Sequence, residues 1–304
     1  MGSISKITRN TRLGFRQKLK NHEKLKSSVS AINKRYSSLI GPLHSLPDYL
    51  IIGAAKCGTS SLYEYLVQHP NVEPAIGKEI NFFDMRYDRG INWYRTYFPP
   101  LIQRNFTKNI FKNNLITGEA TPRYIDHPHA PERVAKTIPN VKLIVMLRNP
   151  VDRAYSHWNM MVAHKREELS FEEAIDKERE RITGLFEKMS KDETYYSREY
   201  YWYAYLERSI YISKLKRWFK YFPREQFLFL KSEEFFKDPN TVYAKALNFL
   251  GLEEFELEDY KTIRKGSYKK SKMESSTRTK LLEFFKPKNE ELYKFLGINF
   301  EWDK

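Results

Sequence analysis

Cysteine is almost absent from this chain: Cys57 is the one cysteine in 304 residues. A lone cysteine excludes a disulfide within the chain and fits a reducing compartment. Long apolar runs are also lacking, since no stretch approaches the ~20 residues of a membrane span. The first residues contain no apolar core of a signal peptide. We therefore expect a soluble, cytoplasmic protein.

Acidic residues are too few to balance the basic ones. The chain has 53 lysines and arginines against 38 acids, which gives a net charge of +15. Such an excess favours anionic ligands: nucleotides, acidic glycans, nucleic acid or a membrane surface. Hydrophobic residues make up 41% of the chain, enough for the core of one large α/β domain or two small ones.

Much of the positive charge lies at the N-terminus. Residues 1–40 hold ten lysines and arginines and a single acid, Glu23, and the apolar residues from Leu25 to Leu39 share one helical face. Two interpretations stay open: a solvated tail ending in a helix packed on the domain, or an arm for an anionic membrane or an acidic partner. We place the basic arm at 1–44 and the folded domain at 45–304, with a peripheral membrane location under the second interpretation.

The most informative stretch runs from Asp48 to Leu66. Its short apolar run, Tyr49 to Ile52, indicates a buried strand. Gly53 and Gly58 bracket a tight loop, and the apolar spacing after it predicts a helix from Thr59 or Ser60. A strand, a glycine-bounded loop and a helix N-terminus are typical of an anion site, in which amides point at a phosphate.

This loop differs from the ATP-binding form G-x-x-x-x-G-K-[ST], because Lys56 lies inside it and Thr59 follows Gly58. The next strong strand, Lys142 to Leu147, ends in Arg148 where a magnesium-binding aspartate is usual. We expect Asn149 to cap the following helix and Pro150 to occupy its first position. The sequence therefore predicts a ligand with two separate phosphate-type groups and no metal.

These features resemble the sulfotransferases that use 3′-phosphoadenosine-5′-phosphosulfate (PAPS), above all the heparan sulfate enzymes and their bacterial relatives. The resemblance implies an α/β, P-loop-like sulfotransferase fold with a central parallel β-sheet flanked by helices on both sides. It implies that the loop binds the 5′-phosphosulfate and that Arg148 with Ser156 binds the 3′-phosphate. The donor-binding residues implied by this match are Ala54, Ala55, Lys56, Cys57, Gly58, Thr59, Ser60, Ser61, Arg148 and Ser156.

Glu79 is a carboxylate shortly after the loop, where no metal is expected to need it. On the residues alone, a surface salt bridge with Lys78 or Arg86 is an equal alternative. The stretch is similar to the family's K-E-x-H-F-F-D, in which the glutamate is the catalytic base. The resemblance thus implies that Glu79 and Lys56 are catalytic, although Asn81 stands where the histidine is usual.

The segment from Thr117 to Tyr124 resembles the family's E-K-T-P-x-Y stretch, whose lysine contacts the sugar acceptor. Here that position is Ala120, and Arg123 is a charge nearby. His127 and His129 follow, either as solvated loop residues or as part of the acceptor cleft.

Further along, we expect one long aromatic helix from Glu199 to Tyr221 and a third strand from Gln226 to Leu230. A basic loop with Lys265 and Gly266 resembles the family's K-G-R loop, which closes over the 3′-phosphate, although Ser267 replaces its arginine. On charge pattern alone the same loop is a solvated lysine turn.

The expected function is transfer of the sulfuryl group from PAPS to an acceptor hydroxyl, favoured as a glycan, with Glu79 as base and 3′,5′-phosphoadenosine (PAP) as product. Sulfation of a lipid or secondary-metabolite hydroxyl is the first alternative. A kinase would need the magnesium carboxylate that is missing. A non-enzymatic binder of anionic polymers would leave both phosphate signals unexplained, so we expect no nucleic-acid partner.

Overall fold

This computed structural model describes residues 36–111, 114–260 and 273–302. Most of the basic arm and the loop with Lys265 and Gly266 lie outside these ranges. At the start of the described chain, Tyr36 and Leu39 are exposed. Ser37 is buried, and His44 donates a hydrogen bond from Nδ1 to the Phe98 carbonyl at 2.6 Å.

A five-stranded parallel sheet forms the centre of the molecule, in the order β2-β3-β1-β4-β5. The two central neighbours, β1 and β4, are almost entirely buried, as expected for continuous apolar strands covered on both faces. All three predicted strands are confirmed. The strands are β1 (Tyr49–Gly53), β2 (Val72–Pro74), β3 (Ile116–Ala120), β4 (Lys142–Leu147) and β5 (Phe227–Lys231).

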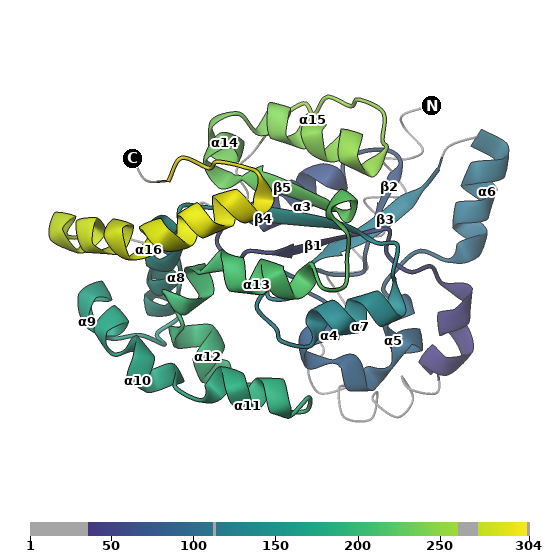
Figure 1. The fold of residues 1–304 in the computed structure, drawn as a ribbon. Coiled ribbons are helices and arrows are strands. Elements are labelled where there is room, and N and C mark those ends of the chain that lie inside the picture. The colour runs from purple at the N-terminus through teal and green to yellow at the C-terminus, as the bar shows by residue number, and fades with distance from the viewer. Residues whose placement is uncertain (1–35, 112–113, 261–272, 303–304) are drawn as a thin grey trace.

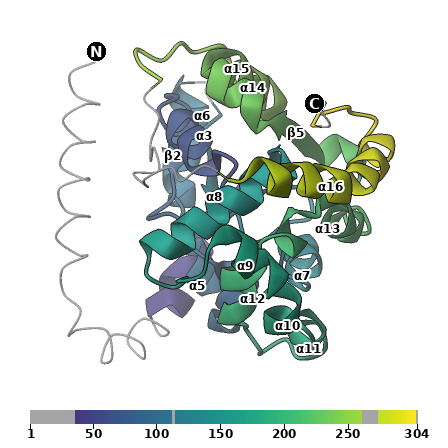
Figure 2. The ribbon, with the colours of Figure 1, turned by 90° about the vertical axis from the view of Figure 1, so that its left-hand side faces the viewer.

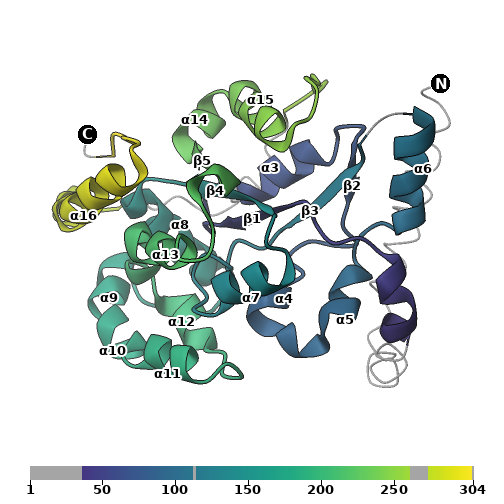
Figure 3. The same ribbon diagram turned by 45° about the vertical axis from the view of Figure 1, so that its right-hand side comes forward.

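Helices cover both faces of this sheet, as Figures 1 and 3 show. One layer contains α3 (Thr59–Leu66), α14 (Ser232–Lys237) and α15 (Pro239–Leu250); the other contains α7 (Ala130–Thr137) and α13 (Tyr211–Trp218). The long C-terminal α16 (Ser275–Leu296) packs on α13 and on α8 (Pro150–Ala163). The expected α/β architecture, with a parallel sheet between helical layers, is confirmed.

The strand order places a crevice at the carboxyl edge of the sheet. After β1 the chain builds β2 and β3 on one side, whereas β4 leads to β5 on the other side. The connections after β1 and β4 therefore leave in different directions, and open α/β sheets bind their ligands at such a switch point.

Two helix boundaries follow the expected capping chemistry. Asn149 accepts a hydrogen bond from the Val151 amide at 3.0 Å, and Pro150 opens α8. Asp238 caps α15 through the Thr241 amide, and Gly251 ends it with a left-handed φ of 75°.

The long aromatic helix predicted from Glu199 to Tyr221 is wrong. The chain instead forms α12 (Arg198–Tyr203), a 3₁₀ turn at Glu207–Ser209 and then α13. The buried carboxylate of Glu178 accepts the amides of Leu206 and Glu207 at 2.7 and 2.8 Å. These amides therefore do not form the hydrogen bonds of a continuous helix. The helix is interrupted here, and the Arg208 side chain is buried.

The sequence interpretation also missed β2 and β3. The β3 sequence, Ile-Thr-Gly-Glu-Ala, lacks a continuous apolar run. Gly118 is required there, because a Cβ atom would lie 2.5 Å from the Tyr49 carbonyl oxygen on the paired strand.

The remaining helices are short and form two groups. One group follows β2: α4 (Phe82–Met85), α5 (Ile91–Arg95) and α6 (Leu101–Phe111). The other gathers with α12 beside α8 (Figure 2): α9 (Phe171–Asp176), α10 (Glu178–Ile182) and α11 (Leu185–Lys191). Within the described ranges, no helix has the length and apolar character needed to cross a membrane.

Candidate active site

A cleft of about 530 Å³ lies at the carboxyl edge of the sheet. It is bordered by the segments that follow β1, β3 and β4, with α8 and α12 along its side. Most of the predicted site residues line it together: Ala55, Lys56, Gly58, Thr59, Ser60, Ser61, Glu79, Arg148 and Ser156. Arg123, expected as a charge near the acceptor, and Arg208 line it as well. Residues that the sequence interpretation did not place there also line it: Pro122, His157, Met160, Met161, His164, Arg166, Tyr201, Trp202 and Phe236.

The loop after β1 presents the N-terminus of α3 to this cleft. Gly58, with a left-handed φ of 91°, directly precedes the helix and supplies no side-chain cap. In the described part of the chain, the amides of Gly58, Thr59 and Ser60 have no hydrogen-bond partner. Free amides at a helix N-terminus attract an anion, which is the property that the sequence predicted for this loop.

Ala54 and Cys57 lie beneath the loop and do not line the cleft; both side chains are buried. Ser232 holds the Cys57 carbonyl at 2.8 Å, and burial raises the pKa of the Cys57 thiol to about 11. The thiol therefore stays protonated at neutral pH, and these two residues can serve a ligand through their backbone alone.

Arg148 and Ser156 face the cleft from the end of β4 and from α8. The Arg148 guanidinium makes one long contact, 3.4 Å to the Lys56 carbonyl, and lies 5.7 Å from the centre of the Phe236 ring. Ser156 and Met160 on α8 and His164 at its C-cap are spaced four residues apart, so they form one face along the cleft. This spacing is the sequence signal that could have identified the cleft-lining residues of α8.

Glu79 also lines the cleft and is half-buried. The proposed alternative, a salt bridge with Lys78 or Arg86, is not formed. Lys78 pairs with Glu64 at 3.4 Å, and Arg86 donates to the Ile80 carbonyl at 3.0 Å. No ion pair to Glu79 occurs among the described residues.

Asn81 joins the Glu79 segment to Arg123. Its side-chain amide donates to the Glu79 carbonyl, and its oxygen accepts from Arg123 at 2.6 Å. Arg123 also donates to the Tyr196 hydroxyl at 2.7 Å and approaches the buried Asp84 carboxylate at 3.6 Å. Asn81 and Arg123 thus support the backbone of the segment that carries Glu79.

Two buried arginines lie beside the floor of the cleft. Arg208 forms an ion pair with Asp126 at 2.8 Å, and Arg153 donates to Ser209 at 2.7 Å. Both guanidinium groups approach Nδ1 of His157, at 3.4 and 3.5 Å. Burial, together with these two charges, holds the pKa of His157 well below its usual value, so this histidine is neutral.

His127 and His129 belong to neither expected environment. His127 is buried, and burial lowers its pKa to about 3. His129 bonds to the Met189 carbonyl at 2.9 Å through Nε2. Neither lines the cleft, so the described structure gives both a packing role.

The cleft is strongly basic. Among the described residues, Lys56 and four arginines border it, whereas Glu79 is the single acid. Within the described ranges, no three histidine, cysteine, aspartate or glutamate side chains gather as a metal site would require. The donor groups present, cationic side chains and backbone amides, suit phosphate and sulfate oxygens.

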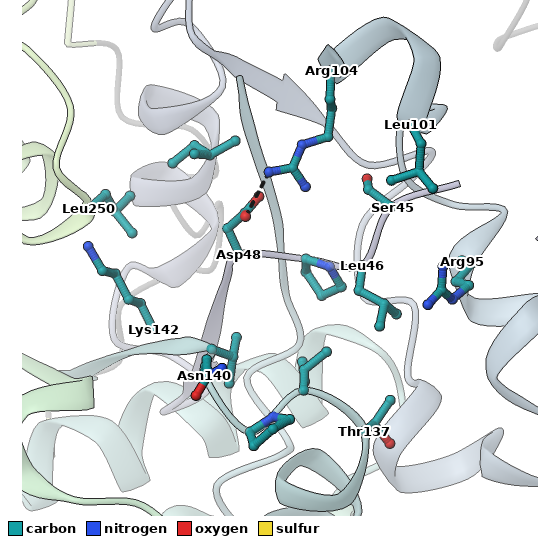
Figure 4. A pocket seen from close by; sticks show the side chains of 15 residues that line it. Ser45, Leu46, Asp48, Arg95, Leu101, Arg104, Thr137, Asn140, Lys142 and Leu250 are labelled. Carbon is teal, nitrogen blue, oxygen red and sulfur yellow. Dashed lines mark hydrogen bonds and ion pairs between the residues drawn. The ribbon is translucent and has the colours of Figure 1, made fainter. Parts of the chain in front are cut away.

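A second hollow, of about 670 Å³, lies at the opposite edge of the sheet, where β1, β3 and β4 begin (Figure 4). Its charged groups are paired. Arg104 donates to Asp48 at 2.9 Å, Lys142 to the Phe249 carbonyl at 2.7 Å and Arg95 to the His44 carbonyl at 2.9 Å. Because these charges are already bound within the protein, we assign the chemistry to the smaller cleft.

Comparison with known proteins agrees with this geometry. The Sulfotransferase domain family matches residues 46–303. The chain is 31% identical to human heparan sulfate glucosamine 3-O-sulfotransferase 3B1 over 280 residues, which cover 85% of this chain and 65% of that protein. It is 26% identical to the membrane-associated sulfotransferase kil1 of Dictyostelium discoideum, with 86% and 68% covered.

A crystal structure of a sulfotransferase from Alicyclobacillus acidocaldarius superposes with a TM-score of 0.65 and 31% identity, covering 86% of this chain and all of that one. The chain spans a little under two thirds of the human relative's length. The family match includes the loop after β1, the end of β4 and the Glu79 segment. On this evidence, the chain belongs to the sulfotransferase family.

Proposed function

We propose that this protein transfers the sulfuryl group of PAPS to a glycan hydroxyl by in-line displacement. The observation that carries the proposal is the shared cleft: the α3 N-terminus, Arg148 with Ser156, and Glu79 all border one cavity. Family membership supports sulfuryl transfer in general. The donor, the base and the acceptor are the finer parts of the proposal.

Two separate anion sites support PAPS as the donor. The loop after β1 offers the amides of Gly58, Thr59 and Ser60 with the Lys56 charge to a 5′-phosphosulfate. Arg148 and Ser156 offer a guanidinium and a hydroxyl to a 3′-phosphate. ATP has no 3′-phosphate, so this second site is what selects PAPS. Lys265 and Gly266, predicted to close over the same phosphate, lie outside the described residues and remain part of the proposal.

Glu79 is the proposed base because it is the one carboxylate on the cleft and forms no ion pair in the described structure. It takes the proton of the acceptor hydroxyl while the hydroxyl oxygen bonds to sulfur and the bond from sulfur to the leaving phosphate oxygen breaks. Lys56 stabilises the negative charge that develops on that leaving oxygen. PAP and the sulfated acceptor are the products.

A glycan acceptor is proposed because the similar human protein is a heparan sulfate sulfotransferase. The cleft agrees, since Trp202 and Arg166 line it side by side, with the guanidinium 4.6 Å from the centre of the ring, and offer an aromatic ring and a positive charge to an acidic sugar chain. A lipid or secondary-metabolite hydroxyl is the alternative acceptor.

The test is transfer of labelled sulfate from PAPS to heparan sulfate and to a panel of hydroxyl acceptors, without magnesium. We expect label on the glycan, and calorimetry should show that PAP binds without magnesium and far more tightly than ATP. Equal affinity for the two nucleotides would contradict the donor assignment. Label on a lipid or small hydroxyl alone would replace the glycan as acceptor.

A further inference from the structure

Glu119 is a fully buried carboxylate in β3 that does not line the cleft. Three hydroxyl groups donate to it. The hydroxyls of Tyr94 and Tyr124 reach its Oε1 at 2.7 and 2.8 Å, and the Thr121 hydroxyl reaches its Oε2 at 2.6 Å. A buried carboxylate with this many donors is a fixed centre for the groups around it.

Two of these hydroxyls also accept backbone amides from the segment that carries Glu79. The Phe82 amide donates to the Tyr124 hydroxyl at 2.9 Å, and the Asn81 amide donates to the Thr121 hydroxyl at 3.4 Å. A hydroxyl has a single proton. Because that proton goes to Glu119, the oxygen lone pairs are left to face the amides.

The Glu79 segment needs such support. Glu79 and Asn81 both have left-handed backbone angles, with φ of 51° and 57°. Residues other than glycine adopt such angles at a cost on the order of 1–3 kcal/mol, and they persist where the surroundings determine them. The hydrogen bonds from the backbone amides of Asn81 and Phe82 to the two hydroxyls anchor the chain just after Glu79.

We propose that Glu119 is a positioning residue for the base. Through the hydroxyls of Thr121 and Tyr124 it fixes the amides of Asn81 and Phe82, and this holds the Glu79 carboxylate toward the acceptor hydroxyl. The inference rests on the proposed role of Glu79 and assigns to Glu119 no contact with the substrate.

The network requires Glu119 to be ionised, since only a carboxylate accepts from all of its neighbours. Burial raises the pKa of Glu119 to about 6, against the three hydroxyl bonds that lower it, and Asp84 of α4 raises it further. The group is therefore charged above pH 6 and becomes protonated below it. Protonation places a hydrogen-bond donor among three hydroxyls that already donate to this carboxylate. The hydrogen bonds that orient two of these hydroxyls toward the Asn81 and Phe82 amides therefore weaken as the pH falls through about 6.

Glu119→Gln tests this inference, because it keeps the side-chain shape and places an amide donor in the ring. We expect kcat to fall by about 10²-fold, the loss typical of a small misplacement of reacting groups. The KM for PAPS and the calorimetric affinity for PAP should stay as in the parent. The acid limb near pH 6 in the kcat profile should disappear.

Thr117→Val is the matched control. Thr117 lies on the same strand, is equally buried and donates to the Glu73 carbonyl at 2.7 Å, away from the Glu79 segment. The Thr117→Val variant loses the hydrogen bond of a buried hydroxyl on β3 that lies outside the Glu119 network. Its kcat should therefore stay near the parent value.

Amide hydrogen exchange gives a readout that does not depend on the acceptor. The amides of Asn81 and Phe82 should be protected in the parent and in Thr117→Val, and should exchange faster in Glu119→Gln. If Glu119→Gln fails to fold, two tyrosine variants replace it. Tyr124→Phe removes a donor to Glu119 together with the acceptor of the Phe82 amide, while Tyr94→Phe removes a donor to Glu119 and leaves both amide acceptors in place. Tyr124→Phe should then expose the Phe82 amide and lower kcat more than Tyr94→Phe does.

Unchanged kcat and unchanged amide protection in Glu119→Gln would overturn the inference while the proposed function stands. A parent that transfers no sulfate from PAPS to any acceptor would overturn the proposed function. In that case, loss of amide protection in Glu119→Gln would still support the hold of Glu119 on the segment.

Discussion

The two ends of the central sheet are both hollow and both charged, yet they are built differently. At the start of the strands, the charges of Arg104, Lys142 and Arg95 are each bound to a carboxylate or a carbonyl of the protein. At the carboxyl edge, the amides of the α3 N-terminus have no partner in the described structure, and Glu79 has no ion pair.

The larger of the two hollows, about 670 Å³, is the one at the start of the strands, where the charged groups are already paired. Size therefore does not identify the site. Polar groups already bonded within the protein hold elements together, whereas buried or half-buried groups without partners cost free energy unless a ligand satisfies them. The comparison predicts that substitutions at the carboxyl edge change activity and that substitutions at the other edge change stability alone.

The largest effect should come from Glu79→Gln, which keeps the shape of the side chain and removes its basicity. We expect the rate of sulfate transfer to fall by ~10²–10⁴-fold, the contribution of a positioned general base. Affinity for PAP, measured by calorimetry, should not change, because the donor site does not use this carboxylate. Near-full activity of the variant would move the base elsewhere, and a collapse of PAP binding would make Glu79 a structural partner of the loop.

Lys56→Ala should follow, with a loss of ~10²–10³-fold in kcat, as for the removal of one donor aligned with a developing charge. Lys56→Arg is the informative companion, since it keeps the charge but changes the geometry and should recover part of the rate. Thermal unfolding identifies variants that lose structure. If a folded Lys56→Ala enzyme turns over at the parent rate, the lysine merely tethers the donor.

The parts of this site that follow local sequence rules could be predicted. The strand, the glycine-bounded loop and the start of α3 at Thr59 were all visible in 19 residues, Asp48 to Leu66. The Asn149 cap likewise depends on the residue type and its neighbours. Such features are fixed by backbone chemistry within a few residues, so the sequence determines them.

Contacts that depend on tertiary packing could not be predicted. Glu119 lies in a strand without an apolar run, and its partners come from α5 and the loop after β3. The break before α13 depends on Glu178, which is about 28 residues away in sequence. The hydrophobic pattern contains no signal for a buried carboxylate that binds amides, so a helix was predicted across the break.

Arg148→Ala should have a smaller effect that is confined to binding. Loss of a hydrogen bond to a charged group costs about 1.5–3 kcal/mol, which corresponds to roughly 10- to 100-fold in affinity. We expect PAP to bind more weakly by that factor, and adenosine 5′-phosphosulfate, which lacks the 3′-phosphate, to bind as tightly as to the parent. An equal loss for both ligands would show that Arg148 supports the loop through the Lys56 carbonyl and does not read the 3′-phosphate.

Arg104→Gln at the opposite edge should have the smallest effect and completes the comparison. Arg104 is paired with Asp48 at 2.9 Å, but their side chains are 24% and 33% exposed, and solvent screens such a pair. Asp48 keeps its bond from the Thr117 amide at 2.8 Å, so its carboxylate is not left without a partner. We expect the free energy of unfolding to fall by less than about 1 kcal/mol in urea titrations, with kcat and PAP affinity equal to those of the parent. A loss of activity in a fully folded Arg104→Gln enzyme would mean that the larger hollow takes part in the reaction, and the distinction between the two edges of the sheet would fail.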